Sequence, residues 1–411
     1  MMHTTLKVML ITMLFVIHQI ANCQTLDWSE KANPLMNSIN GVAFNSSGDE
    51  VISGTNCHPA SIRLFETSNG NLNWDYEVGS DFLCIMGVAI SANKSYIAAI
   101  EEYGNILIFD NTGLLPIIID TIKTGTDYGF SVAISPDNST LLVGCSDGKM
   151  MGYQIETGEL IFDINAHSSW VTTVAYSPDG AYIISGGNDD KVKIWQSNGV
   201  LIYTCSGHIG DITCVKVSPD NQFVVSSSKD DLIKIWDIET GVEIRTLNGH
   251  ENNVNGVDIS PDSKYIVSVS TDATNKIWQL STGNLLSTFG LIDCGAVNAV
   301  AWSPAGDKIV TGNAKSDVML WSVDMLVLPV HELTQSNIKI YPNPTSDFLQ
   351  FEIDKTFAFD KIIVLDSIGK KVLSVPATTK LDIRELSSGI YLVYLMSNNA
   401  IMAQQKITII K

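Results

Sequence analysis

The sequence lacks the short patterns that most often mark a metal or cofactor site. It contains no His-Glu-x-x-His, no Cys-x-x-Cys, no calcium loop of EF-hand form and no glycine-rich phosphate loop. Histidine is scarce, with 7 in 411 residues. We therefore predict no catalytic residue, no cofactor and no metal ligand, and a protein that is not an enzyme.

Positive charge is also scarce. Lys and Arg number 25 against 44 Asp and Glu, a net charge of −19. Residues 24–333 have a net charge of −22, whereas residues 334–411 have a net charge of +2. An acidic body of this size repels phosphate backbones and anionic lipids, so nucleic acid is not an expected partner. The acidity suits an exported protein that must stay soluble.

Long apolar runs are absent except at the N-terminus. Val8 to Ile17 is apolar apart from one threonine and follows Lys7, which is typical of a signal peptide. We predict a signal peptide over residues 1–23 with cleavage between Cys23 and Gln24. A lipoprotein, acylated at Cys23, is the alternative, and Asn22 disfavours it. No later run is as long, so no transmembrane span is expected in the mature chain.

One pattern recurs seven times after residue 40: an apolar strand, a short polar turn and a second apolar strand. Successive copies start 41 to 46 residues apart. The turns contain Pro, Asp, Asn and Gly, which suit tight bends. The copies begin at Val42, Val88, Val132, Val174, Val215, Val257 and Val300.

Each copy continues with a third strand that ends in an aromatic residue, and most add a turn and a fourth strand. Four strands in 41 to 46 residues are typical of a propeller blade, and such blades bury their faces only by stacking around an axis. The repeats therefore predict an all-β, seven-bladed propeller over residues 24–330. The aromatic residues are Phe65, Phe109, Tyr153, Trp195, Trp236, Trp278 and Trp321.

Three copies resemble the WD40 repeat. Gly207-His208 and Gly249-His250 match its Gly-His dipeptide, and Trp236-Asp237 matches its Trp-Asp pair. The resemblance implies a buried hydrogen-bonded tetrad in each of these copies rather than a catalytic set. The tetrads are His167, Ser185, Asp189 and Trp195; His208, Ser226, Asp230 and Trp236; and His250, Ser268, Asp272 and Trp278.

The other copies depart from the WD40 pattern. Copies one, two and seven lack the histidine, and copy three keeps only Asp147 and Tyr153. These copies represent either tolerated drift or a surface adapted for binding, and the sequence leaves both open. In WD40 proteins the loops that hold Cys57 and Cys84 lie on one face in neighbouring blades, so the resemblance makes a disulfide between them possible.

Ring closure has two candidate strands. The stretch from Leu26 to Ser29 resembles an outer blade strand and would complete the seventh blade from the N-terminal side. The competitor is Leu326 to Val330, where Pro329 fits only an edge strand. We favour the N-terminal strand.

The repeats stop after Trp321, and we predict a linker over residues 331–337 and a small domain over residues 338–411. Alternating strands from Ile338 onwards suggest an immunoglobulin-like β-sandwich. The tail resembles the type A sorting domain of the type IX secretion system of Bacteroidetes. The resemblance rests on Tyr341-Pro342-Asn343-Pro344, on Asp366 to Lys370 and on Leu386 to Tyr391.

These features together predict a protein that is secreted or attached to the outer cell surface. It would engage the type IX secretion machinery through its tail and present the propeller as a non-catalytic scaffold for a protein, surface or cell-envelope ligand. An extracellular propeller enzyme, a hydrolase or lyase with an axial site, is the alternative. An intracellular assembly adaptor is a third possibility, which the signal peptide and the tail disfavour.

Overall fold

The computed structural model describes residues 24–31, 38–56, 60–78, 84–113, 115–290, 295–323, 338–342, 344–353, 360–365, 371–397 and 400–411. These residues are almost entirely in strands and turns, which confirms the all-β prediction. The chain forms two compact units. One unit contains the repeats and the other contains the C-terminal tail.

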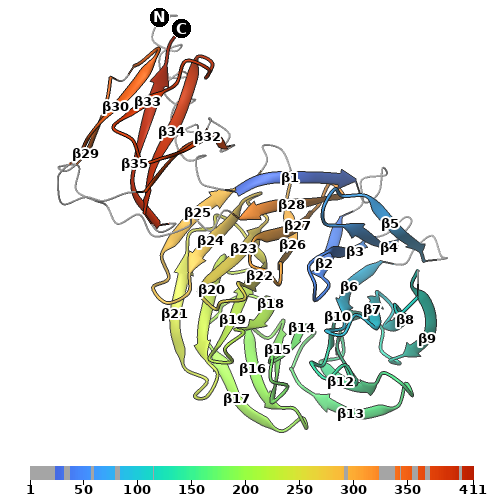
Figure 1. Ribbon diagram of the computed structural model, residues 1–411. Coiled ribbons are helices and arrows are strands. Elements are labelled where there is room, and N and C mark those ends of the chain that lie inside the picture. The colour runs from blue at the N-terminus through green and yellow to red at the C-terminus, as the bar shows by residue number, and fades with distance from the viewer. Residues whose placement is uncertain are drawn as a thin grey trace, which may run out of the picture. The chain divides into compact units, whose positions relative to one another are not determined.

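The repeats form seven four-stranded antiparallel sheets, which we number as blades 1 to 7 (Figure 1). From the axis outward, the first three blades are β2 (Ile39–Phe44), β3 (Glu50–Thr55), β4 (Ser61–Glu66) and β5 (Leu72–Glu77); β6 (Ile85–Ile90), β7 (Tyr96–Glu101), β8 (Asn105–Asp110) and β9 (Ile117–Lys123); and β10 (Gly129–Ile134), β11 (Thr140–Cys145), β12 (Lys149–Gln154) and β13 (Leu160–Asn165).

Blades 4 to 7 follow the same plan. They are β14 (Val171–Tyr176), β15 (Tyr182–Gly187), β16 (Lys191–Gln196) and β17 (Leu201–Ser206); β18 (Ile212–Val217), β19 (Phe223–Ser228), β20 (Leu232–Asp237) and β21 (Glu243–Asn248); β22 (Val254–Ile259), β23 (Tyr265–Ser270), β24 (Asn275–Gln279) and β25 (Leu285–Phe289); and β26 (Val297–Trp302), β27 (Lys308–Asn313), β28 (Asp317–Val323) and β1 (Gln24–Lys31).

The turn between the first and second strands shows why the repeated Ser-Pro-Asp sequence makes a hairpin. In blade 4 the Ser177 hydroxyl donates to Asp179, 2.6 Å away, and accepts the Tyr182 N–H, which closes the turn. Gly180 has a φ of 72°, and Asn221 and Ser263 hold the same left-handed conformation in blades 5 and 6. Pro and Asp therefore set the bend, and the residue after them completes it.

The seven innermost strands close into a ring, because each contacts the innermost strands of both neighbouring blades. Strand β1 pairs with β28 and supplies the outer strand of blade 7, which confirms the predicted N-terminal closure. The Ser322 hydroxyl donates to Asp27, and the Trp28 indole donates to the Thr67 carbonyl at 2.8 Å. Trp28 therefore also ties blade 7 to blade 1. The competing segment, residues 326–330, lies outside the described residues.

The tail forms two antiparallel sheets. One contains β29 (Ile338–Tyr341), β30 (Phe348–Ile353) and β33 (Lys380–Asp382), and the other contains β32 (Lys371–Pro376), β31 (Lys361–Leu365), β34 (Gly389–Ser397) and β35 (Ala400–Ile409). A buried cluster joins both sheets and includes Leu349, Val364 and Val393. Strand β33 has 3 residues, too few to show an alternating pattern in the sequence. The immunoglobulin-like assignment stays a prediction.

The cysteines divide into two kinds. Cys84 is disulfide-bonded, and Cys57, its expected partner, lies outside the described residues, so the pairing stays a prediction. Cys145 and Cys205 are free and buried in blade cores, as expected for small hydrophobic residues. Burial raises the pKa of Cys205 to about 12, which disfavours the reactive thiolate.

Candidate functional site

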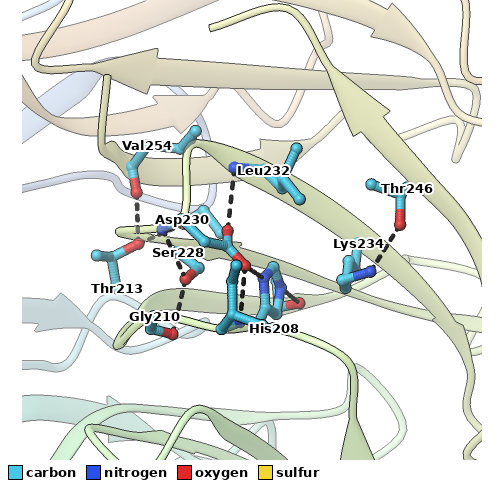
Figure 2. A network of polar contacts seen from close by, with 12 residues as sticks. His208, Gly210, Thr213, Ser228, Asp230, Leu232, Lys234, Thr246 and Val254 are labelled. Atoms are coloured by element: carbon cyan, nitrogen blue, oxygen red, sulfur yellow. Dashed lines mark hydrogen bonds and ion pairs between the residues drawn. The ribbon is translucent and has the colours of Figure 1, made fainter. Parts of the chain in front are cut away.

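Blades 4 to 6 bring together each predicted set of His, Ser, Asp and Trp. In blade 5, His208 Nδ1 lies 2.8 Å from Asp230, His208 Nε2 lies 2.9 Å from Ser226 Oγ, and the Trp236 indole donates to Ser226 Oγ at 2.8 Å. Asp230 also accepts the Leu232 N–H, so it holds the turn as well as the imidazole of His208 (Figure 2). Blades 4 and 6 repeat these contacts within 0.1 Å.

The donors and acceptors define one proton arrangement. Because the Trp N–H donates to the Ser oxygen, the Ser O–H donates to His Nε2, and His Nδ1–H donates to the Asp carboxylate. Burial lowers the pKa of His167, which favours the neutral ring that this arrangement needs. Burial by itself would raise the pKa of Asp189, but the hydrogen bond and charge of His167, together with the N–H groups of Ser168 and Lys191, outweigh burial and lower it.

Each tetrad serine is fully buried and already bonds to two partners. It therefore has neither access to a substrate nor a free donor. This complete pairing supports the prediction that the tetrads serve the fold.

Blades 7 and 3 keep only parts of the network. In blade 7 the Trp321 indole donates to Thr311 Oγ1 at 2.9 Å, so threonine stands in for serine. The sequence held this signal, since Thr311 lies ten residues before Trp321. In blade 3 the Tyr153 hydroxyl instead donates a hydrogen bond to Met151 Sδ.

Blade 2 differs from the tetrad blades at the position of the aspartate. In the turn between its second and third strands, Tyr103 occupies the position that Asp230 occupies in blade 5. The residues that follow, Gly104 and Asp231, both adopt the left-handed conformation, with φ of 73° and 67°. The turn is therefore unchanged, but a 51% exposed tyrosine replaces the tetrad carboxylate.

These turns share one face of the propeller. In a four-stranded meander, the turn from the second to the third strand lies at the end where the fourth strand finishes. The connection to the next blade starts at the end where the fourth strand finishes. A connection of five residues, such as 166–170, is too short to run along strands of six residues to the opposite face. The tetrad turns and the connections between blades therefore lie on one face, which we call the tetrad face.

Four aromatic rings gather on the tetrad face, and we call them the aromatic surface: Tyr103, Tyr128, Phe130 and Trp170. The rings form two pairs, with centroids 6.0 Å apart for Tyr103 and Tyr128 and 5.0 Å apart for Phe130 and Trp170. Tyr128 is 39% exposed and Trp170 is 45% exposed. Exposed aromatic rings gathered in one place make this surface a candidate interaction site.

Backbone hydrogen bonds hold this surface in place. The Ser146 N–H donates to the Tyr128 carbonyl at 3.0 Å, and the Tyr128 N–H donates back to the Ser146 hydroxyl at 3.1 Å. The Gly129 N–H donates to the Glu102 carbonyl next to Tyr103. The backbone of Tyr128 is thereby held to the turn between β11 and β12 of its own blade, and Gly129 holds the same segment to the turn of blade 2 that carries Tyr103. A ligand would therefore meet a backbone that is already in place.

A second departure from the repeat pattern places the half-buried Phe130 beside Trp170. At the second position of the innermost strand, five blades place an Asn or Thr whose side chain donates to a carbonyl of the next blade, as Thr213 does to Val254 (Figure 2). Blade 2 has Met86 at this position and blade 3 has Phe130. The five inter-blade bonds come from Asn40, Thr172, Thr213, Asn255 and Asn298.

Negative charges outnumber positive ones on the loops around the aromatic surface, although Lys123 and Lys191 flank these loops and Lys193 Nζ donates to the Ala166 carbonyl at 2.6 Å. The loops that carry or touch it, residues 102–104, 124–128, 146–148, 166–170 and 188–190, contain five carboxylates and no Lys or Arg. Glu101, directly before this group, is buried, and burial raises its pKa. Lys149 begins the next strand and turns to Asp163, 2.7 Å away. The carboxylates are Glu102, Asp127, Asp147, Asp189 and Asp190.

Residues 144–148 form a Gly-x-Ser-x-Gly pattern that sequence reasoning overlooked. In a nucleophile elbow such a serine joins a strand to a helix. Here Ser146 lies in a turn between β11 and β12, and its hydroxyl accepts the Tyr128 N–H. Within the described ranges, no group of three His, Cys, Asp or Glu is arranged to hold a metal, and no helix is long and apolar enough to cross a membrane.

Two protein families match the chain. The WD domain, G-beta repeat, matches residues 158–196, 199–237, 241–279 and 283–322. The secretion system C-terminal sorting domain matches residues 339–411. This chain carries WD40 repeats and a C-terminal sorting domain. Its sorting domain points to export by type IX secretion, to the cell surface or the extracellular space.

The curated relatives that the chain matches share only the repeats. It is 31% identical to a periodic tryptophan protein 2 homolog of Mus musculus over 20% of this chain and 9% of that protein. It is 30% identical to nuclear distribution protein PAC1 of Komagataella phaffii over 39% of this chain and 31% of that protein. The WD40 chain thus spans less than a third of the length of these relatives.

Proposed function

We propose that this WD40 chain is an exported, non-catalytic scaffold that binds a protein partner through the aromatic surface. The sorting domain supports engagement of the type IX machinery and a final place outside the cell. The predicted signal peptide would supply the first transport step, and it lies outside the described residues. The observation that carries the proposal is the pairing of the half-buried Phe130 with the exposed Trp170, together with the exposed pair Tyr103 and Tyr128.

Two features support binding rather than drift in the irregular blades. Drift would leave small or polar residues in exposed turns, whereas blades 2 to 4 present large rings there. The rings also replace residues that serve the fold elsewhere, namely a tetrad aspartate and an inter-blade donor. Rigid aromatic residues supply large contact areas at low entropic cost, so they are common anchors in protein interfaces.

Affinity capture tests the proposal with the full secreted chain as bait on cell-surface extract. The test variant combines Tyr103→Ser and Trp170→Ser, and the control combines Val200→Ser and Val242→Ser, which remove two exposed apolar side chains from turns on the opposite face. We expect one protein that the wild type and the control recover and the test variant loses. Equal recovery by all three baits, or turnover of a substrate that depends on the propeller, would contradict the proposal.

Export has its own test. Removing residues 338–411 from the full-length chain should leave the protein inside the producing cell, while the propeller still folds because the two units are separately compact. Surface labelling and fractionation measure this. Undiminished export of the truncated chain would show that the tail is not the sorting signal.

A further inference from the structure

The charge pattern on the tetrad face points to the chemistry of the partner. We infer that the aromatic surface binds an extended Lys- or Arg-bearing segment of a partner protein, with side-chain cations over the rings and near the flanking carboxylates. This inference rests on the proposed function, and it adds the class of ligand.

The rings provide the first half of the site. A cation binds favourably over an aromatic face within about 6 Å of the ring centre. Trp170 and Tyr103 are each about half exposed, so part of each ring is open to a ligand. Tyr128 and Phe130 are two residues apart on one segment, so the two ring pairs meet along it. A segment that crosses from blade 2 to blade 4 would pass both pairs.

The carboxylates provide the second half. Five of them lie on the loops around the rings, where they outnumber the flanking Lys123 and Lys191. Lys149 is paired with Asp163 and Lys193 donates to the Ala166 carbonyl, so the loops keep an excess of negative charge that attracts cations. Asp189 is occupied by His167, but Asp127 is exposed and lies next to Tyr128. An anionic glycan, a phosphate group or a nucleic acid would be repelled at this place. A neutral glycan could stack on the rings but would gain nothing from the charges.

The opposite face provides an internal comparison. It is also acidic, but its aspartates close the Ser-Pro-Asp turns, as Asp179 does with Ser177. Its exposed apolar residues, such as Val200 and Val242, are aliphatic rather than aromatic. Among the residues that the structure describes, only the tetrad face therefore combines carboxylates with exposed rings.

Binding of three synthetic twelve-residue peptides to the full secreted chain tests the inference. The peptides alternate Gly-Ser with Arg, with Gln or with Glu, and affinity is measured by fluorescence anisotropy at low and high salt. We expect binding of the Arg peptide, little binding of the Gln peptide and none of the Glu peptide. Raising the ionic strength from 0.05 M to 0.5 M should weaken the Arg peptide several-fold.

Matched variants separate a specific site from general attraction to an acidic protein. Trp170→Ser and the pair Glu102→Gln with Asp127→Asn should each weaken the Arg peptide by about tenfold. The control pair, Glu156→Gln with Glu159→Gln, removes the same charge from an exposed turn on the opposite face and should change affinity less than twofold. Unchanged circular dichroism and melting temperature confirm that each variant is folded.

The outcomes distinguish this inference from the proposed function. If both pairs of charge variants weaken the peptide equally, or Trp170→Ser has no effect, the cationic site is wrong. Binding of a captured partner could depend on the aromatic surface but be unaffected by salt and by competition from the Arg peptide. That result would support the scaffold function and contradict the cationic site. Tighter binding of a neutral oligosaccharide than of the Arg peptide would also overturn the inference. If neither a partner nor a peptide binds, both proposals fail.

Discussion

Blades 4 to 6 and blades 1 to 3 share one strand plan but use the tetrad face differently. In blades 4 to 6, the polar residues of that face are buried in tetrads that bond the turns to the strands. In blade 2 the position of the tetrad aspartate carries the exposed Tyr103, and in blade 3 the position of the inter-blade donor carries the half-buried Phe130. The four WD40 matches begin at residue 158, so they include the tetrad blades and, of the first three blades, only the outer strand β13.

The comparison shows how one repeat protein divides stability from recognition. A blade is held chiefly by its stacked neighbours, so some blades can lose a polar network without loss of the ring. The freed positions can then face outward. The binding surface that we propose therefore lies mainly in the blades that depart from the repeat pattern, with Trp170 of blade 4 at its border.

The sharpest test of this division removes equivalent serines from the two halves. Ser226→Ala should lower the free energy of unfolding by about 3 kcal/mol, because His208 and Trp236 would both lose their buried partner. Ser53 has the same strand position in blade 1, but its buried hydroxyl has no partner among the described residues. Ser53→Ala should therefore cost less than about 0.5 kcal/mol. Chemical denaturation of both variants measures the difference, and equal losses would contradict it.

The second test concerns the covalent bond in the irregular half. If Cys84 pairs with Cys57, the closed loop is short and its reduction should cost about 3 kcal/mol by the chain-entropy relation. Mass mapping of the non-reduced protein identifies the partner. Thermal unfolding with and without reductant then measures the loss. A peptide that links Cys84 to any other cysteine would refute the pairing.

The third test uses pH. The lowered pKa of His167 means that the unfolded chain binds protons more readily below the ordinary value of 6.5. Stability should therefore be complete above that value and fall as the pH decreases through it, and the lowered pKa of Asp189 adds a further loss at lower pH. Hydrogen exchange of blade 4 between pH 7.5 and 5 measures this. His167→Gln should flatten the dependence near pH 6.

The smallest expected effect comes from making blade 3 regular. Phe130→Thr would give it the donor that Thr172 and Thr213 use to reach the next blade. We expect a gain of up to about 0.5 kcal/mol in the free energy of unfolding, together with loss of binding at the aromatic surface. A variant that is more stable and still binds the ligand would show that Phe130 is not part of the binding site.

Local patterns were sufficient to predict much of this architecture. The period of the repeats, the turn residues and the strand around Trp28 led to the ring and its closure, because each is encoded within about 45 neighbouring residues. The tetrads were equally predictable, since constant spacing within one blade places their members together. Thr311 follows the same spacing and could have been found.

The aromatic surface depended on the tertiary structure. In the sequence, Tyr103, Tyr128 and Trp170 stand 25 and 42 residues apart in turns of ordinary composition, and nothing marks them as neighbours. They meet because the ring stacks blades 2 to 4 side by side and aligns their loops on one face. Periodicity within a blade determines the fold, whereas a surface shared by several blades arises only when the ring places them together.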